Sequence, residues 1–504
     1  MAISHVVVIG AGMGGLAAAA DLARRGARVT VLERAATPGG KARRVPVAGA
    51  AVDGGPTVFT MRWIFEGLFA DAGKRLEDFV TIHAADTLAR HAWRTGGRLD
   101  LFADVERSVE AIGDFAGPED ARGYRDFVAR SGAIYRTLAG PFIASERPSP
   151  LGLVRRVGDI GALLRTTPWL TMWQALGKHF RDPRMRQLFG RYATYCGCSP
   201  FLAPATLMLV AHVEQDGVWL VQGGMSRVAV AIRELAESQG ATFRFDAEVA
   251  EIIVERGRAA GVKLADGEKI AADAVVFNGD VSALGQGLLG AQAKPAAAET
   301  PRAVRSLSAI TWCVNAPTSG FALAHHNVFF AEDYAQEFAA IFRARGITQA
   351  PTVYVCAQDR GHGEVAEGAP ERLLLLVNAP PDGDRGEFSD AMLAATQAAS
   401  FALLTRCGLT VQATPETAVR TTPAGFHALF PGTGGALYGR ASHGAMGTFA
   451  RPGAVSRIPG LYFAGGSVHP GPGVPMAAMS GRLAAARLLE DLAGSTAPVS
   501  LPHA

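Results

Sequence analysis

The sequence has few cysteines, few charged residues and no long apolar run. Charged residues make up 19% of the chain, and the formal net charge is only +3. That charge is too mild to predict a nucleic-acid partner. No stretch reaches the ~18 uninterrupted apolar residues of a membrane-spanning helix. These absences argue against a nucleic-acid-binding protein and against an integral membrane protein.

The five cysteines are odd in number and scattered, which predicts no disulfide framework and fits a reducing compartment; they are Cys196, Cys198, Cys313, Cys356 and Cys407. The Cys-Gly-Cys spacing at positions 196–198 is too short for a zinc pair. We expect buried or inert thiols. No metal cluster, Ser–His–Asp set, P-loop or internal repeat is evident, and we expect no metal. The first predicted strand begins almost at the N-terminus, so we expect no signal peptide.

The N-terminal segment carries the pattern of a dinucleotide-binding turn. An apolar strand is expected at residues 6–9 and a helix at residues 14–25, with Gly26 ending the helix. Between them, Gly10 allows a tight turn, Gly12 lets the backbone approach a pyrophosphate, and Gly15 lets the helix pack closely. The N–H groups that open the helix at Gly14 would face the phosphates.

A second strand is expected at residues 29–32, and Glu33 follows it. A carboxylate there can accept hydrogen bonds from ribose hydroxyls and disfavours a 2′-phosphate. The run Gly39-Gly40-Lys41-Ala-Arg43 would then pass close to a diphosphate and flavin. Lys41 or Arg43 would supply positive charge, although a solvated basic loop is the alternative.

A second clamp lies near the C-terminus. A strand is expected at residues 461–464, a turn at Gly465-Gly466, and a helix at residues 476–489. A helix N-terminus stabilises negative charge on a reduced flavin, so the N–H groups of Val474 and Met476 are candidate donors. Two distant clamps that converge on one dinucleotide predict an FAD enzyme.

His469 lies in the loop of the second clamp. It is the candidate catalytic residue, as a proton acceptor or flavin contact. The alternative is a structural loop histidine, and the sequence leaves both open.

The chain predicts an α/β fold with a discontinuous Rossmann-like FAD-binding domain at residues 1–90, 221–299 and 431–504. In its second part, Ser226 would cap a helix to Ser238. Strands follow at residues 242–245, 249–255, 261–264 and 274–278, and Val249 would lie beside the adenine. Residues 91–220 form a helical region and residues 300–430 an α+β substrate domain, with strands at 352–357 and 373–378.

One stretch of the helical region, residues 151–180, mixes Leu and Trp with Arg and Lys. Such a mixture is typical of helices that lie in a membrane interface. The alternative is an ordinary amphipathic helix packed on the core.

Several motifs together resemble the bacterial carotenoid desaturases, which are phytoene-desaturase-like flavoproteins. They are Asp53-Gly-Gly55-Pro-Thr57, residues 325–334, 353–360, 430–439, and the Gly465-to-Gly481 block. The run His469-Pro-Gly-x-Gly-Val-Pro475 is the most specific of them. Ser467 stands where many other flavoproteins have an Asp, which also fits this family. The resemblance spans nearly the whole chain and is strongest to the hydroxyneurosporene (methoxyneurosporene) desaturases.

The resemblance implies an FAD enzyme on a glutathione-reductase-like or amine-oxidase-like fold. Its cofactor residues would be Gly10, Gly12, Gly14, Gly15, Glu33, Gly40, Lys41, Arg43, Gly55, Val249, Gly465, Gly466, Val474 and Met476. It implies an acyclic 1-hydroxycarotenoid substrate that gains a C3–C4 double bond. It also implies peripheral attachment to the cytoplasmic side of the inner or photosynthetic membrane, with a quinone or another electron acceptor. A polar group at the far end of an apolar tunnel would read the 1-hydroxyl.

Other functions stay open at this point. A phytoene-type desaturase would act at an earlier step. An amine or protoporphyrinogen oxidase would take a charged or macrocyclic substrate. A non-enzymatic lipid escort on a related fold would not need a complete flavin site, and the two intact clamps count against it.

Overall fold

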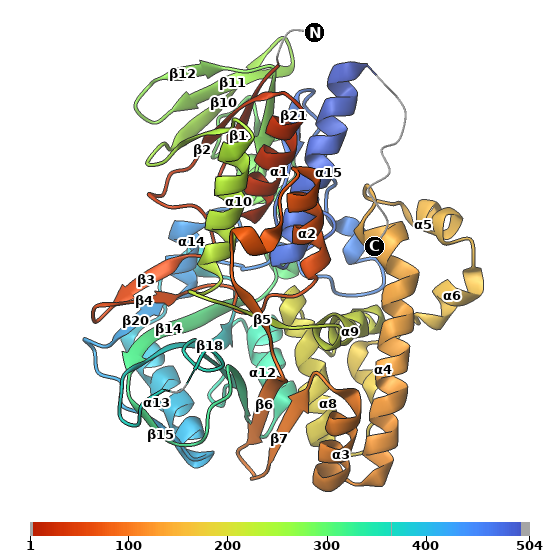
Figure 1. Cartoon of the computed structure of the whole chain (residues 1–504), viewed down its shortest axis with the longest axis vertical. Coiled ribbons are helices and arrows are strands. Elements are labelled where there is room, and N and C mark those ends of the chain that lie inside the picture. The colour runs from red at the N-terminus through yellow and green to blue at the C-terminus, as the bar shows by residue number, and fades with distance from the viewer. Residues whose placement is uncertain (1–3, 364, 495–504) are drawn as a thin grey trace.

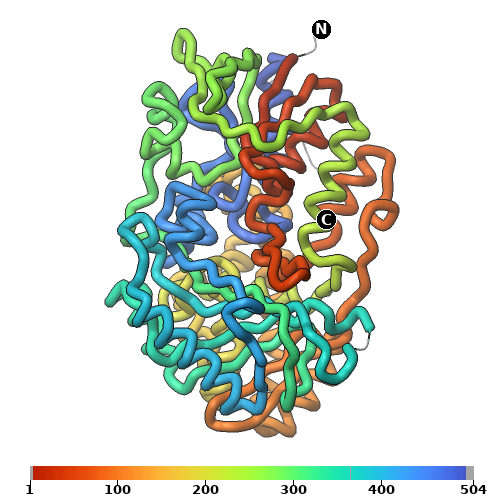
Figure 2. The backbone as a smooth tube through the Cα atoms, turned by 90° about the vertical axis from the view of Figure 1, so that its left-hand side faces the viewer, coloured from red at the N-terminus to blue at the C-terminus, as the bar shows by residue number. Residues whose placement is uncertain are grey.

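The computed structural model describes residues 4–363 and 365–494. A nucleotide-binding lobe and a lobe built on a larger sheet stand one above the other (Figures 1 and 2). The predicted segments 1–90 and 431–504 each extend by a few residues beyond the described part.

The upper lobe contains a parallel five-stranded sheet whose strands come from three distant segments of the chain. The order is β21 (Leu461–Phe463), β13 (Ala274–Phe277), β1 (His5–Ile9), β2 (Arg28–Leu32) and β9 (Thr242–Arg244). Every neighbouring pair is parallel. Parallel sheets are buried on both faces, which explains the continuous apolar run in β1.

Alternate residues of the strands face two different cores. Val6 and Val8 pack against α1 (Met13–Arg24), α10 (Ser226–Ser238) and α15 (Val474–Ala493). Val7 and Ile9 face the opposite layer. That layer is an antiparallel sheet of β10 (Val249–Glu255), β11 (Arg258–Leu264) and β12 (Lys269–Ala271).

Most predicted elements of this lobe are confirmed to within a few residues. Two details differ. Ser226 is not the cap of α10, because the cap position is Met225 and the Ser226 hydroxyl accepts from Arg44 Nε at 2.8 Å. The C-terminal helix begins at Val474 rather than at residue 476, with Pro475 in its first turn, where a proline lacks only a free N–H.

The lower lobe is built on a seven-stranded sheet. Its order is β20 (Ala418–Thr421), β14 (Ser308–Ala316), β18 (Glu371–Ala379), β17 (Val353–Ala357), β16 (His326–Phe330), β6 (Thr87–Trp93) and β7 (Arg98–Phe102). The predicted boundary at residue 90 is wrong, since it falls inside β6. The hairpin β6–β7 pairs with β16 and so belongs to this sheet.

Helices cover both faces of the lower sheet. One face packs against α13 (Asp390–Arg406). The other packs against the helical region (Figure 1), which comprises α3 (Val105–Ala116), α4 (Pro118–Leu138), α5 (Pro150–Val157), α6 (Ile160–Arg165), α7 (Met172–Leu176), α8 (Pro183–Gly190) and α9 (Leu209–Gln215). No helix of the described residues is long and apolar enough to cross a membrane.

Short elements complete the chain. They are the strand pairs β3 (Arg44–Val47) with β4 (Ala50–Asp53), β5 (Ile82–Ala84) with β8 (Trp219–Val221), and β15 (Thr318–Gly320) with β19 (Leu409–Val411), and the helices α2 (Arg62–Asp71), α11 (Val281–Gly285), α12 (Tyr334–Ala339) and α14 (Pro423–Leu429).

The two ends of the chain meet where α1 packs against α15. An added Cβ at Gly481 would lie 2.0 Å from the carbonyl oxygen of Gly14, so the two backbones touch. A buried ion pair joins the same helices, with Arg482 Nε 3.1 Å from Asp21 Oδ2. Arg482 also contacts Asp71 of α2. The pair ties three helices together beneath the sheet.

Replacing Arg482 with Met should destabilise the fold by about 3 kcal/mol, because it leaves the buried Asp21 carboxylate without its main partner. The free energy of unfolding in urea would measure the loss. Arg487→Met on the same helix is the matched control. Arg487 pairs with Glu146 and Asp491 at the surface, so its loss should cost less than about 1 kcal/mol. Equal effects of the two variants would contradict this account.

Candidate cofactor and substrate site

A large cavity of about 1040 Å³ runs between the lobes. Its lining includes the glycines of both clamps, side chains of the seven-stranded sheet, and residues next to α5 and α6. A cavity of this size can hold a large ligand. Twelve of the predicted cofactor residues line it: Gly10, Gly12, Gly14, Glu33, Gly40, Lys41, Gly55, Val249, Gly465, Gly466, Val474 and Met476.

The glycines of the first clamp lie where a side chain would collide. An added Cβ at Gly15 would lie 2.1 Å from the Gly10 carbonyl oxygen, so Gly15 serves close packing and does not line the cavity. Gly10 has a φ of +93°, which favours glycine. An added Cβ at Gly14 would lie 2.6 Å from the backbone nitrogen of Gly465, so the two clamps touch each other.

Asn278 also belongs to this site, although the sequence predicts it only as the last residue of a strand. Its Nδ2 donates to the Gly10 carbonyl at 3.1 Å, and its side chain lies against Gly12 and Gly465. Asn278 follows β13, the strand beside β1, and ligands in such sheets bind at the carboxyl ends of the strands. The position of Asn278 at the carboxyl end of a predicted strand is therefore the feature of the sequence that could have indicated it as a site residue.

The Glu33 carboxylate is buried and fixed. Oε2 accepts the Ala11 N–H at 2.7 Å and Oε1 accepts the Ala35 N–H at 2.9 Å. Each oxygen keeps a further lone pair. The side chain lines the cavity, and its contact with a ribose stays a prediction.

Lys41 and Arg43 separate in the structure. Lys41 Nζ lies at the cavity and donates to the Leu437 carbonyl at 2.6 Å. Burial lowers the pKa of Lys41, and the Asp280 carboxylate partly opposes that effect. Arg43 points elsewhere, with Nη2 donating to Thr421 Oγ1 of β20 at 3.0 Å. It does not line the cavity, because it leads into the β3–β4 hairpin that packs on the lower sheet.

The second clamp presents a helix N-terminus to the cavity. Gly473, with a φ of +111°, precedes α15, and the first residues of α15 line the cavity. Ser480 Oγ of the same helix accepts the Gly465 N–H at 2.7 Å. The turn and the helix are therefore held together.

His469 does not lie at the cavity. Its Nε2 donates to the carbonyls of Phe142 at 2.9 Å and Ser145 at 3.1 Å, and its ring packs edge-on against Phe142. Burial lowers the pKa of His469 to about 4. The neutral ring joins the second clamp to the segment after α4, which agrees with the structural alternative rather than with a catalytic base.

The cavity wall also contains a polar group that the sequence did not predict. Glu214 accepts hydrogen bonds from the Tyr192 hydroxyl at 2.6 Å and the Tyr195 hydroxyl at 2.8 Å. Arg191 Nη1 donates to Tyr195 Oη at 2.7 Å. Arg191, Tyr195 and Glu214 line the cavity and Tyr192 does not. The four residues come from η3 (Arg191–Cys196) and α9, and no motif marks them.

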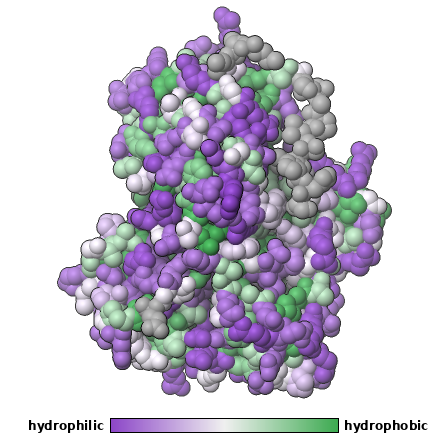
Figure 3. All heavy atoms as spheres, in the orientation of Figure 1, coloured by the Kyte–Doolittle hydropathy of each residue, from purple (hydrophilic) through white to green (hydrophobic). Residues whose placement is uncertain are grey.

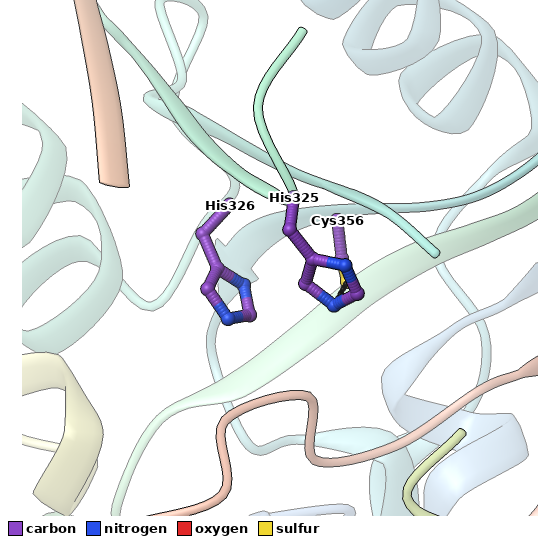
Figure 4. A group of neighbouring side chains, drawn as sticks. All are labelled: His325, His326 and Cys356. Atoms are coloured by element: carbon purple, nitrogen blue, oxygen red, sulfur yellow. Dashed lines mark hydrogen bonds between the residues drawn. The ribbon is translucent and has the colours of Figure 1, made fainter. Parts of the chain in front are cut away.

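A second buried polar cluster lies in the lower sheet, where Figure 4 shows His325, His326 and Cys356. A ligand atom from each lies within 4.8 Å of the others, so they could hold a metal ion. Each residue makes one contact in or beside the cluster. His325 Nε2 lies 3.5 Å from Cys356 Sγ, and His326 Nδ1 lies 2.7 Å from Tyr354 Oη. His326 Nε2 is buried and has no hydrogen-bond partner among the described residues.

Residues 13–489 match the model of a family described as flavin containing amine oxidoreductase. A hydroxyneurosporene desaturase of Rubrivivax gelatinosus is 56% identical over 97% of this chain and 94% of its own length.

This chain belongs to the flavin-containing amine oxidoreductase family, in the group of the hydroxyneurosporene desaturases.

Another hydroxyneurosporene desaturase, from Cereibacter sphaeroides, is 44% identical over 97% of this chain and 98% of its own length. Among solved structures, a triple mutant of putrescine oxidase has a TM-score of 0.61 at 14% identity. The match covers 98% of this chain and 99% of that chain. It confirms the amine-oxidase-like fold.

FAD is the cofactor of this family member, and the residues fit it. Gly12 and Gly40 leave the backbone bare at the cavity, and an added Cβ at Gly40 would lie 3.3 Å from the Cα of Gly12. Glu33 suits a ribose, and Lys41 with the N-terminus of α15 suits negative charge. These are the residues that would hold it.

Gly12→Ala should weaken FAD binding at least tenfold, because the added Cβ would lie 2.8 Å from Asn278 Nδ2 and would push apart the turn that lets the backbone approach the pyrophosphate. Flavin absorbance per protein after gel filtration, and titration of the apoprotein with FAD, would measure the loss. Gly346→Ala is the matched control, since an added Cβ there meets nothing within 4 Å. Unchanged FAD affinity in the Gly12 variant would contradict this assignment.

Proposed function

We propose that this chain is a carotenoid desaturase that introduces a C3–C4 double bond into acyclic 1-hydroxycarotenoids or 1-methoxycarotenoids. The observation that carries the proposal is one continuous cavity from the two cofactor clamps to an apolar wall of Leu and Phe side chains. Such a cavity suits a long apolar chain. The relatives named hydroxyneurosporene desaturase support the same substrate class.

Desaturation removes a hydride from one carbon and a proton from its neighbour, and bound FAD would accept the hydride. The protein orients the substrate and excludes water. Positive charge that builds on the polyene is delocalised along it, so a weak acceptor in the cavity wall, such as the Tyr354 hydroxyl oxygen, can take the proton. Tyr354 offers the cavity a hydroxyl that lies 2.8 Å from Thr57 Oγ1 and 2.7 Å from His326 Nδ1.

The first test is the reaction itself. We expect the purified protein with FAD, liposomes and a quinone acceptor to convert 1-hydroxyneurosporene into a product with red-shifted polyene bands that keeps its hydroxyl. Visible spectra and chromatography would follow it.

Other results would redirect the assignment. Desaturation of phytoene instead would move the enzyme to an earlier step. Oxygen-dependent turnover of amines or of protoporphyrinogen would favour an oxidase. A protein that neither contains nor binds FAD would revive the lipid escort.

We also propose that the enzyme binds the cytoplasmic face of the inner or photosynthetic membrane through α5 and α6. Their segment exposes Leu151 and Ile160 at 61% and Trp169 at 59%, and Figure 3 shows apolar side chains among polar ones on this projection. Arg155, Arg156 and Arg165 lie beside them. Exposed apolar side chains with arginines are typical of interfacial helices.

The same segment also contributes to the cavity. Pro150, Leu153, Leu163 and Pro168 line it, while their neighbours Leu151, Leu164 and Trp169 face outward. A lipid-soluble substrate could then enter from the bilayer, and a membrane quinone could approach on the same side. Five free thiols suit the reducing face of that membrane.

Leu164→Ser combined with Trp169→Ser should reduce binding to anionic liposomes about tenfold or more, because two side chains lose their apolar contact with lipid. Liposome co-sedimentation would measure it. Met392→Ser with Val419→Ser removes two exposed apolar side chains from α13 and β20, away from α5 and α6, and should bind as the unaltered protein does. Equal binding by both double variants would refute this surface.

A further inference from the structure

Arg191 has more hydrogen-bond donors than the protein satisfies. It is 5% exposed, and Nη1 donates to Tyr195. Its Nε and Nη2 contact no acceptor among the described residues, and the nearest carboxylate oxygen, Glu214 Oε1, lies 4.0 Å from Nη2. Buried donors without acceptors are costly, and this side chain lines the cavity. The Nε and Nη2 groups of Arg191 can therefore donate to an oxygen of a ligand in the cavity.

Tyr195 and Glu214 fix the guanidinium in place. The Tyr195 hydroxyl accepts a hydrogen bond from Arg191 and donates one to Glu214, so one phenol joins the two charged groups. Glu214 is only 3% exposed and balances the charge of Arg191. The paired charges limit the repulsion that a lone cation would exert on a polyene that develops positive charge.

The position of Arg191 suits a group close to the reacting carbons. At the other end of η3, an added Cβ on Gly197 would touch the Tyr438 ring. The Tyr438 and Gly466 carbonyls share Arg451 Nη1 at 3.0 Å each, so η3 packs beside the second clamp. A 3₁₀ helix rises about 2 Å per residue, which places Arg191 about 10 Å along η3 from Cys196.

Tyr354 lines the same cavity, and its hydroxyl lies 2.8 Å from Thr57 Oγ1, two residues after Gly55 of the cofactor site. C1 of the substrate is only two bonds from C3. A group that binds the oxygen on C1 must therefore lie near the site of desaturation, not at the remote end of the cavity as the sequence reading expected.

We propose that Arg191 binds the oxygen on C1 of the carotenoid and so determines the preference for 1-oxygenated substrates. This inference rests on the proposed function. Arginine only donates hydrogen bonds, so it can bind a hydroxyl oxygen or a methoxy oxygen equally. A carotenoid without that oxygen leaves the buried donors unpaired, which disfavours its binding.

The test compares kcat/KM for 1-hydroxyneurosporene, 1-methoxyneurosporene and neurosporene, which lacks the oxygen. Arg191→Gln should lower kcat/KM for both oxygenated substrates about 10- to 100-fold and leave neurosporene within about threefold. Arg191→Lys keeps the charge but loses the fork, and should recover part of the preference. FAD content confirms that each variant is folded.

Tyr124→Phe is the matched control, because it removes a buried tyrosine hydroxyl that donates to Gln215 at 2.9 Å, outside the cavity and outside the Arg191–Glu214 network. We expect its substrate ratios to match those of the unaltered enzyme. An equal loss on all three carotenoids in Arg191→Gln, or no change in their ratios, would overturn the inference and leave Arg191 a structural residue. Failure of the unaltered enzyme to desaturate any 1-oxygenated carotenoid would instead refute the proposed function.

Discussion

The contact between the first and last long helices of the upper lobe is the constraint on which the site depends. A dinucleotide needs bare backbone on several sides at once, and here that backbone comes from the two ends of the chain. Gly14 and Gly481 let α1 and α15 meet without side chains between them. Arg482 and Asp21 then hold the helices in that position. The two clamps touch because the helices behind them do.

The cavity combines an apolar wall with a few buried charges, and the charges are the informative part. Apolar side chains provide affinity for any long hydrocarbon and distinguish poorly between related ones. Arg191 and Glu214 are expensive to bury and are held by two tyrosines. A charged pair in such surroundings is weak evidence for stability, which leaves recognition as the stronger reason for its presence.

Most elements of the upper lobe could be predicted from the sequence because the features that define them are local in the chain. Glycine spacing, apolar strands and helix ends depend on neighbours in the chain, so β10 has the bounds that were expected and α10 differs by one residue. The hairpin β6–β7 was assigned wrongly because its partner, β16, lies more than 200 residues away. For a related reason, Arg43 was predicted at the cofactor site although it does not line the cavity, and Arg191 was not predicted although it does. Side-chain direction depends on packing between lobes, and a basic residue in a loop resembles one in a cavity wall until the fold is known.

The meeting of α1 and α15 also has a consequence for biosynthesis. Domains generally fold from the N-terminus during synthesis, and here the first strand and glycine turn leave the ribosome long before their partner. The cofactor site lacks its second clamp until α15, which ends at Ala493, has emerged. Complete flavin capture therefore follows the synthesis of α15. Until then, the apolar surfaces that α15 will cover stay open to solvent.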